Sequence, residues 1–134
     1  MYRMVKNLNM EKNNKLIAKF MGWERDDFSL DGYIIPKNWN SHHDLCQDFD
    51  SLSPKDMMFH NSWDWLMPVV DKIEDTCSTN LHKYSANQMI KEKYTFEILS
   101  YSNNFGNTTY GKNKLQVIYK GVVEFIKWYN KIKK

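Results

Sequence analysis

The sequence predicts an α+β protein in which about three helices pack on a short antiparallel sheet. Residues 62–75 and 113–132 repeat apolar side chains at the helical period, which predicts two long helices. Residues 28–35 have the pattern of a β-hairpin, and residues 94–99 alternate as a strand does. The length of 134 residues predicts a single domain, residues 1–134, with a hydrophobic core of its own.

The first predicted element is a short helix from about Asn9 to Met21, and residues 1–8 before it are expected to form a frayed arm. Gly22 is expected to end this helix, because glycine readily adopts the left-handed conformation that closes a helix. Trp23 follows at a position where an apolar side chain commonly packs back onto the last turn.

A β-hairpin is predicted next. Short apolar runs at 28–30 and 33–35 flank Asp31-Gly32, a dipeptide that tolerates the positive φ angles of a tight turn. Pro36 ends the second run. The polar stretch 37–56 is long for a connection in a small domain, so we expect a functional loop, a partly helical excursion or an insertion. Within it, Ser53-Pro-Lys-Asp56 has the composition of a single helical turn.

The central helix is predicted to begin after Ser62, whose hydroxyl can cap the first turn. Trp65 lies on the flank of its apolar face, and Pro68 is expected to kink the helix or to set its first turn apart. The helical phase favours Trp63 as a core residue, in one core with Phe125 of the final helix. The residues expected on the apolar face are Trp63, Leu66, Val70 and Ile73.

A second long polar stretch, 76–93, offers no firm element. Tyr94–Leu99 then alternates as a strand, and residues 108–110 are predicted to form a short returning strand. The final helix is predicted from Leu115 to Ile132, with Asn113 at its N-cap. Its apolar arc is wider than one packing partner requires, so the helix is either buried on two sides or offers part of its surface for docking.

Composition limits the possible functions. The net charge is only +3, and 17 of the 19 basic residues are lysine, which is too mild for a dedicated nucleic-acid binder. The sequence has no apolar leader, no run long enough to span a membrane and only two cysteines, Cys46 and Cys77, which are expected to be free thiols. These features predict a cytoplasmic protein.

No motif for catalysis is present. The sequence lacks a phosphate-binding glycine loop and a nucleophile motif, so we expect a protein that is not an enzyme and needs no cofactor. Asp64, Asp71 and Asp75 share one strip of the central helix, but a solvated acidic face explains them better than a cation site. His43, Cys46, Cys77 and His82 are the possible metal ligands, yet their spacing lacks a C-x₂-C pair, and no metal is expected.

Aromatic residues outside the expected core are the best candidates for contacting a partner. Trp39 stands in the first polar stretch, and Trp65 lies off the main face of the central helix. Lys83 and Tyr84 offer a mixed polar and aromatic contact in the second polar stretch. For Trp39, packing of its own loop onto the domain is an equal alternative.

Three sequence blocks resemble small uncharacterised proteins of Bacteroidetes genomes, prophages and phages. These blocks are KLIAKFMG at 15–22, SWDWLMPVVDKIE at 62–74 and VIYKGVVEFIKWYN at 117–130. The resemblance implies three helices at these positions and carries no known activity or catalytic residue. It implies a phage-type accessory protein that acts by binding.

Two functions are therefore expected as alternatives. The first is a non-enzymatic protein that binds a host or phage protein in the bacterial cell through its aromatic residues and the two polar stretches. Inhibition of a defence system such as a CRISPR effector is one such role that the resemblance suggests. The second is a modest nucleic-acid-binding protein that uses lysines and aromatic residues. Electrostatic binding to nucleic acid weakens steeply with salt, so salt dependence separates the two.

Overall fold

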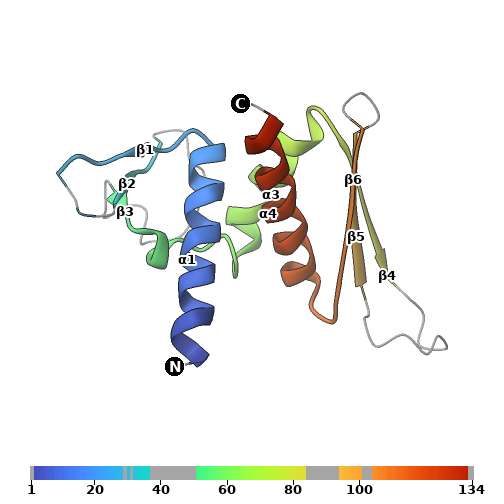
Figure 1. Cartoon of the computed structure of the whole chain (residues 1–134), viewed down its shortest axis with the longest axis horizontal. Helices are drawn as coiled ribbons and strands as arrows, with labels where there is room; N and C mark the ends of the chain where they lie inside the picture. Colours follow the sequence, from blue (N-terminus) through green and yellow to red (C-terminus); the bar gives the residue numbers. More distant parts are fainter. Residues whose placement is uncertain are drawn as a thin grey trace. The chain divides into compact units, whose positions relative to one another are not determined.

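The computed structural model describes residues 2–28, 30, 32–36, 51–83, 94–100 and 104–132. Within them lie the α-helices α1 (Tyr2–Phe20), α3 (Trp63–Glu74) and α4 (Lys114–Ile132), and the 3-10 helix η1 (Pro54–Asp56). The described strands are β1 (Glu24–Arg25), β2 (Tyr33–Ile34), β3 (Ser51–Leu52), β4 (Ser78–Lys83), β5 (Tyr94–Ser100) and β6 (Phe105–Gly111). The predicted α+β class is confirmed, with two three-stranded antiparallel sheets among the described residues (Figure 1).

The chain divides into two compact units, Met1–Leu66 and Met67–Lys134. The first contains α1, η1 and the sheet β1-β2-β3, and the second contains α4 and the sheet β4-β5-β6. The boundary falls inside α3, which contributes residues to both units. The single domain expected from the length stays a prediction.

Helix α1 begins at Tyr2, so the expected frayed arm at 1–8 is wrong. This segment contains neither glycine nor proline, and nothing in it interrupts a helix. The predicted end is confirmed, because Gly22 has a φ of 86° and its N–H donates to the carbonyl of Lys19. The N–H of Trp23 donates to the carbonyl of Ala18 at 2.9 Å, which completes the closing motif, and the Trp23 side chain is buried.

A buried amide joins α1 to the segment around η1. The Nδ2 atom of Asn14 lies 3.1 Å from the carbonyl oxygen of Pro54 and 3.2 Å from that of Met57. It also lies 3.3 Å from Nδ1 of His60. The helical turn predicted at 53–56 is confirmed as η1, and the hydroxyl of Ser53 donates to the carboxylate of Asp56.

Helix α3 has a different phase from the one predicted. Trp63 is 40% exposed, whereas Trp65 is fully buried, so the expectation that Trp63 belongs to the core is wrong. At about 100° per residue the centre of the buried face lies near Val69 and Ile73, and Trp63 is roughly 90° from that centre. Phe125 of α4 is buried as expected. The buried apolar residues of α3 are Trp65, Leu66, Val69, Val70 and Ile73.

Pro68 does not divide α3, which runs without a break from Trp63 to Glu74. Proline removes the N–H that would bond to the carbonyl four residues earlier, here Asp64. Because Asp64 lies in the exposed first turn, water can satisfy that carbonyl at little cost. None of the described helices has the length and apolar content needed to cross a membrane.

Strands β4, β5 and β6 pair as neighbours in sequence and form an antiparallel sheet. Strand β5 is as predicted, with Phe96 and Ile98 buried. Strand β4 lies in the stretch 76–93, where no element was predicted, because its polar residues give no apolar alternation. Strand β6 is longer than the predicted 108–110 and follows a turn at Asn104, which has a φ of 58°.

Helix α4 packs closely on this sheet (Figure 1). Its N-cap is confirmed, because Oδ1 of Asn113 accepts from the N–H of Gln116 at 3.1 Å. The backbone of Gly121 lies so near to β5 that an added Cβ would be 2.6 Å from Cδ2 of Phe96. The hydroxyl of Thr109 on β6 donates to the carbonyl of Val117 at 2.7 Å, which fixes the helix against the strand.

The corrected phase of α3 predicts different costs for its two tryptophans. Trp65→Ala should lower the free energy of unfolding by about 3–5 kcal/mol, because it removes a fully buried ring. Trp63→Ala, the matched control on the same helix, should cost less than about 1 kcal/mol. Denaturant unfolding followed by circular dichroism measures both. Equal losses in the two variants would contradict the phase.

His60 predicts a pH dependence. Burial lowers the pKa of His60 below its ordinary value of 6.5. The unfolded chain therefore binds a proton at a pH where folded His60 is still neutral, so the free energy of unfolding should fall as the pH drops from about 6.5 through the folded pKa. His60→Gln removes this contribution. The free energy of unfolding, measured with urea, should change less between about pH 7 and pH 5 in the variant than in the unaltered protein. An equal decrease in both proteins would exclude His60 as the cause.

Candidate functional site

Of the four residues predicted to contact a partner, the structure describes the side chain of Trp65 alone. Trp65 was expected to face a partner, but it is fully buried, and this expectation is wrong. Its ring centroid lies 5.1 Å from that of Phe59 and 5.9 Å from that of Trp23, so the side chain belongs to an aromatic core. Trp39 and Tyr84 lie outside the described residues, as does the side chain of Lys83 at the end of β4. For these three, contact with a partner stays a prediction.

The described surface has another feature that suits binding. Strands β1 and β2 pair with Arg25 opposite Tyr33, and the chain between them forms a loop. We call this loop the hairpin tip and define it by its described residues, 26–28, 30 and 32. A hairpin was predicted here, but its first strand is at 24–25 and the predicted strand at 28–30 is part of the tip.

The hairpin tip exposes two large apolar side chains. Phe28 is 101% exposed and Leu30 is 99% exposed, so neither side chain gains any burial from folding. Single exposed apolar residues are common, but two of this size on one short loop form an apolar surface with no role in the core. Ile34 on β2 is also partly exposed. The apolar surface at the tip therefore suits a contact with another molecule.

Arg25 fixes the backbone of the hairpin tip. Its Nη1 atom donates to the carbonyl of Gly32 at 2.9 Å, and its Nη2 atom donates to the carbonyl of Leu30 at 2.8 Å. The guanidinium carbon lies 5.4 Å from the centroid of the Tyr33 ring, which adds a cation–π contact. One side chain thus bridges the loop at two points, as the fork of an arginine can.

Asp26 makes two further hydrogen bonds within the hairpin tip. The N–H of Asp26 donates to the carbonyl of Gly32 at 2.9 Å, and the carboxylate of Asp26 accepts from the N–H of Phe28 at 3.0 Å. The second bond makes a local turn of a kind that aspartate favours. Together with the bonds of Arg25, these bonds tie the backbone at Phe28, Leu30 and Gly32 to the base of the hairpin.

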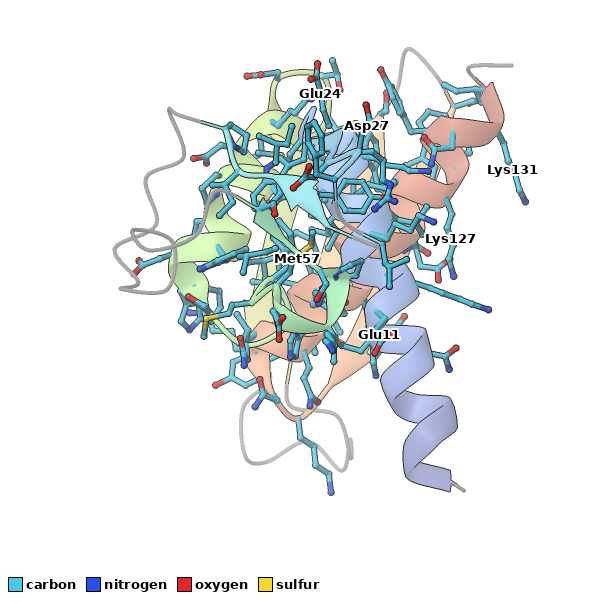
Figure 2. The ribbon with its side chains drawn as sticks, turned by 90° about the vertical axis from the view of Figure 1, so that its left-hand side faces the viewer. Glu11, Glu24, Asp27, Met57, Lys127 and Lys131 are labelled. Atoms are coloured by element: carbon cyan, nitrogen blue, oxygen red, sulfur yellow. The ribbon has the colours of Figure 1, made fainter. Side chains whose placement is uncertain are left out.

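The charge around the apolar pair is negative. Glu24 and Asp27 are exposed, and Figure 2 shows both side chains pointing toward the top of the view from the hairpin. Asp26 adds a third carboxylate, whereas Arg25 directs its guanidinium at the loop carbonyls. This acidic character contrasts with the formal charge of +3 for the whole chain. A partner surface of positive potential would be complementary to it.

The other candidate sites offer less. Asp64 and Asp71 are exposed on α3, and Asp75 is exposed directly after the end of that helix. Of the possible metal ligands, only Cys77 has a described side chain, and the described residues contain no group of three or more potential ligands.

Exposed lysines on α4 form a strip that Figure 2 marks by Lys127 and Lys131. The Nζ atom of Lys127 lies 3.7 Å from a carboxylate oxygen of Glu124, so this strip includes negative charge as well. A mixed strip attracts phosphate less strongly than a continuous basic surface does.

The sequence does contain evidence that the hairpin tip is an exposed loop, although residues 28–30 were predicted to form a strand. The segment from Glu24 to Gly32 contains four acidic residues, one arginine and only two large apolar residues, Phe28 and Leu30. A buried strand rarely has so many charges next to its apolar positions. Charge density around the dipeptide Asp31-Gly32 therefore indicates a long, exposed loop better than a two-residue turn.

Comparison with known families and with curated proteins finds no match for this chain. Among solved structures, the fold is similar to that of a phage protein from Bacillus cereus ATCC 14579, whose structure is a 2.0 Å crystal structure. The TM-score is 0.55 at 19% sequence identity, and the match covers 87% of this chain and 86% of the other. At this identity the comparison establishes a shared fold.

Replacing Arg25 tests whether it fixes the hairpin tip. Arg25→Lys keeps the positive charge, but a lysine cannot donate to two carbonyls in the same forked geometry. The N–H of Asp26 should then exchange with solvent at least about tenfold faster, because opening the loop breaks fewer bonds. Hydrogen exchange followed by NMR measures this rate, and Glu24→Gln is the adjacent control that should leave it unchanged. Unaltered exchange in Arg25→Lys would show that the loop is held by other contacts.

Proposed function

We propose that this protein is a non-enzymatic, phage-type accessory protein that binds a protein partner, and that the hairpin tip is its main contact. The single observation that carries the proposal is the exposure of Phe28 and Leu30 on a loop whose Leu30 and Gly32 carbonyls accept hydrogen bonds from Arg25. The phage-type part rests on the resemblance of the three sequence blocks and is compatible with the fold shared with a phage protein.

The energetics of association support this use of the tip. Large apolar side chains that enter a pocket on the partner provide most of the binding energy of many interfaces. Ordering a flexible loop on binding costs free energy, and a loop that is already ordered avoids that cost. Arg25 and Asp26 bond to the loop backbone in the free protein, so Phe28 and Leu30 are presented at little further entropic cost.

The charges define the kind of partner. Glu24, Asp26 and Asp27 lie within four residues of Phe28 in the chain, so a complementary surface is an apolar pocket bordered by lysine or arginine. Proteins that hold nucleic acid have such basic surfaces. A nucleoprotein effector of a bacterial defence system, including a CRISPR effector, therefore fits the charge of the tip as well as the phage-type resemblance. Trp39, Lys83 and Tyr84 are further proposed contacts.

Binding of nucleic acid is the alternative, and it would have to use the lysines of α4. The hairpin tip would repel phosphate groups, and Glu124 lies among those lysines. A partner held mainly by Phe28 and Leu30, with charge pairs only at the border of its pocket, should lose much less affinity between about 50 and 200 mM salt than nucleic acid, whose affinity should fall steeply. Filter binding to single- and double-stranded nucleic acid across this salt range separates the two.

The proposed contact predicts the effect of polar substitutions in the tip. Phe28→Ser with Leu30→Ser should leave the melting temperature unchanged, because both side chains are fully exposed. Affinity for the partner should fall by at least about thirtyfold, which corresponds to the loss of one strong interface anchor. The partner is first isolated from host lysate with the unaltered protein as bait and then used for titration calorimetry.

A matched control is Ile132→Ser, which removes another exposed apolar side chain, at the end of α4. It should retain the full affinity for the partner. If the double variant binds as tightly as the unaltered protein, the hairpin tip is not the contact.

A further inference from the structure

We propose that strand β6 forms the interface of a symmetric dimer, in which β6 of one copy pairs antiparallel with β6 of a second copy. This surface lies in the second compact unit and does not depend on the function proposed for the hairpin tip. Sheet order places β6 at one edge, and among the described residues it pairs with β5 alone. Within the described residues of the second unit, the backbone N–H and C=O groups on its outer edge therefore pair with no other strand.

Edge strands are normally protected against such pairing by charged residues, proline or a bulge. Strand β6, whose sequence is FGNTTYG, contains no charge and no proline, and its pairing with β5 is regular over all seven residues. The opposite edge of the sheet is formed by β4, which contains Lys83. The two edges therefore differ, and β6 is the one with no charge to oppose a second strand.

The residue order of β6 suits pairing with itself. If the two-fold axis passes through Thr108, then Gly106 lies opposite Tyr110 of the second copy, and Phe105 lies opposite Gly111. In both pairs an aromatic ring faces a residue without a side chain, so the rings do not collide. The centre of the interface is a threonine–threonine pair, which is a favourable cross-strand neighbour.

The outer face of the sheet supports the same register. Residues with even numbers in β6 point away from α4, since Thr109 bonds to α4 and neighbouring side chains alternate. Tyr110 is 54% exposed on that outer face, and Gly106 pairs with the half-buried Leu99 of β5. The ring of Tyr110 from the second copy would cover Gly106 and Leu99, which is a known way in which an aromatic residue compensates for glycine in a sheet.

The inner face does not prevent the pairing. The ring centroid of Phe105 lies 4.4 Å from that of Trp128 and 5.6 Å from that of Phe125, so Phe105 is held under α4 of its own copy. The residue opposite Phe105 is Gly111, whose inner face is already covered by Val117 of its own α4, so the ring of Phe105 from the other copy stays under its own helix and need not enter that space. The dimer would join two three-stranded sheets into one sheet of six strands, with Thr108 at the two-fold axis.

Charge substitution at the axis tests the proposal. Thr108 is exposed, so Thr108→Lys and Thr108→Glu should fold as the unaltered protein does, which melting curves check. Each variant places like charges opposite each other across the axis, so its dimer dissociation constant should rise at least about tenfold. An equimolar mixture of the two variants should regain the dimer, because lysine then faces glutamate. Sedimentation equilibrium measures the dimer dissociation constant of each variant and of the mixture.

Asn80→Lys is the matched control. Asn80 on β4 and Thr108 on β6 are the two neighbours of Glu97, so both substitutions place a lysine beside the same glutamate, and only one lies at the proposed axis. This variant should dimerise as the unaltered protein does. A protein that stays monomeric up to about 1 mM, or a Thr108→Lys variant that dimerises normally, overturns the proposal. A monomer whose β6 pairs with a peptide of another protein also overturns it.

Discussion

The first unit depends on the buried amide of Asn14. This side chain is fully enclosed, and it donates to the carbonyls of Pro54 and Met57, about forty residues away in the chain. An apolar residue in its place would deprive the enclosed carbonyl of Met57 of this donor and would leave that of Pro54 with only the N–H of Met57 at 3.4 Å, and such losses are costly. The amide therefore determines where residues 57–60 lie, and through Phe59 it determines the packing of Trp23. Strand β1 begins directly after Trp23. The two hydrogen bonds of Asn14 therefore also influence where the hairpin tip lies.

The elements that the sequence predicts best are those whose signals are local. The end of α1 at Gly22 and the start of α4 at Asn113 each follow from a capping residue that acts on its nearest neighbours. The predicted phase of α3 was wrong because Trp63 and Trp65 are both large aromatic residues, and the sequence pattern does not show which of the two is buried. Contacts with Trp23 and Phe59 decide between them, and these contacts are distant in sequence.

The candidate site was harder to predict than the fold, for a related reason. Exposure of Phe28 and Leu30 depends on Arg25, whose side chain bonds across the loop, and no propensity scale includes such a bond. Apolar residues near a turn dipeptide favour strand pairing in any local interpretation. The edge position of β6 could not be predicted from its residues either, because it depends on the order of the strands in the sheet.

The arrangement of β4, β5 and β6 also bears on how quickly the second unit folds. Each strand pairs with the next in the chain, and α4 packs on the two strands that directly precede it. Contacts between near neighbours close short loops, lose little chain entropy and form early. The first unit instead needs Asn14 to meet residues more than forty positions later, which requires a long loop to close. On a ribosome the unit with the more distant contacts emerges first, so it is exposed to the cell, incompletely folded, for longer than its neighbour.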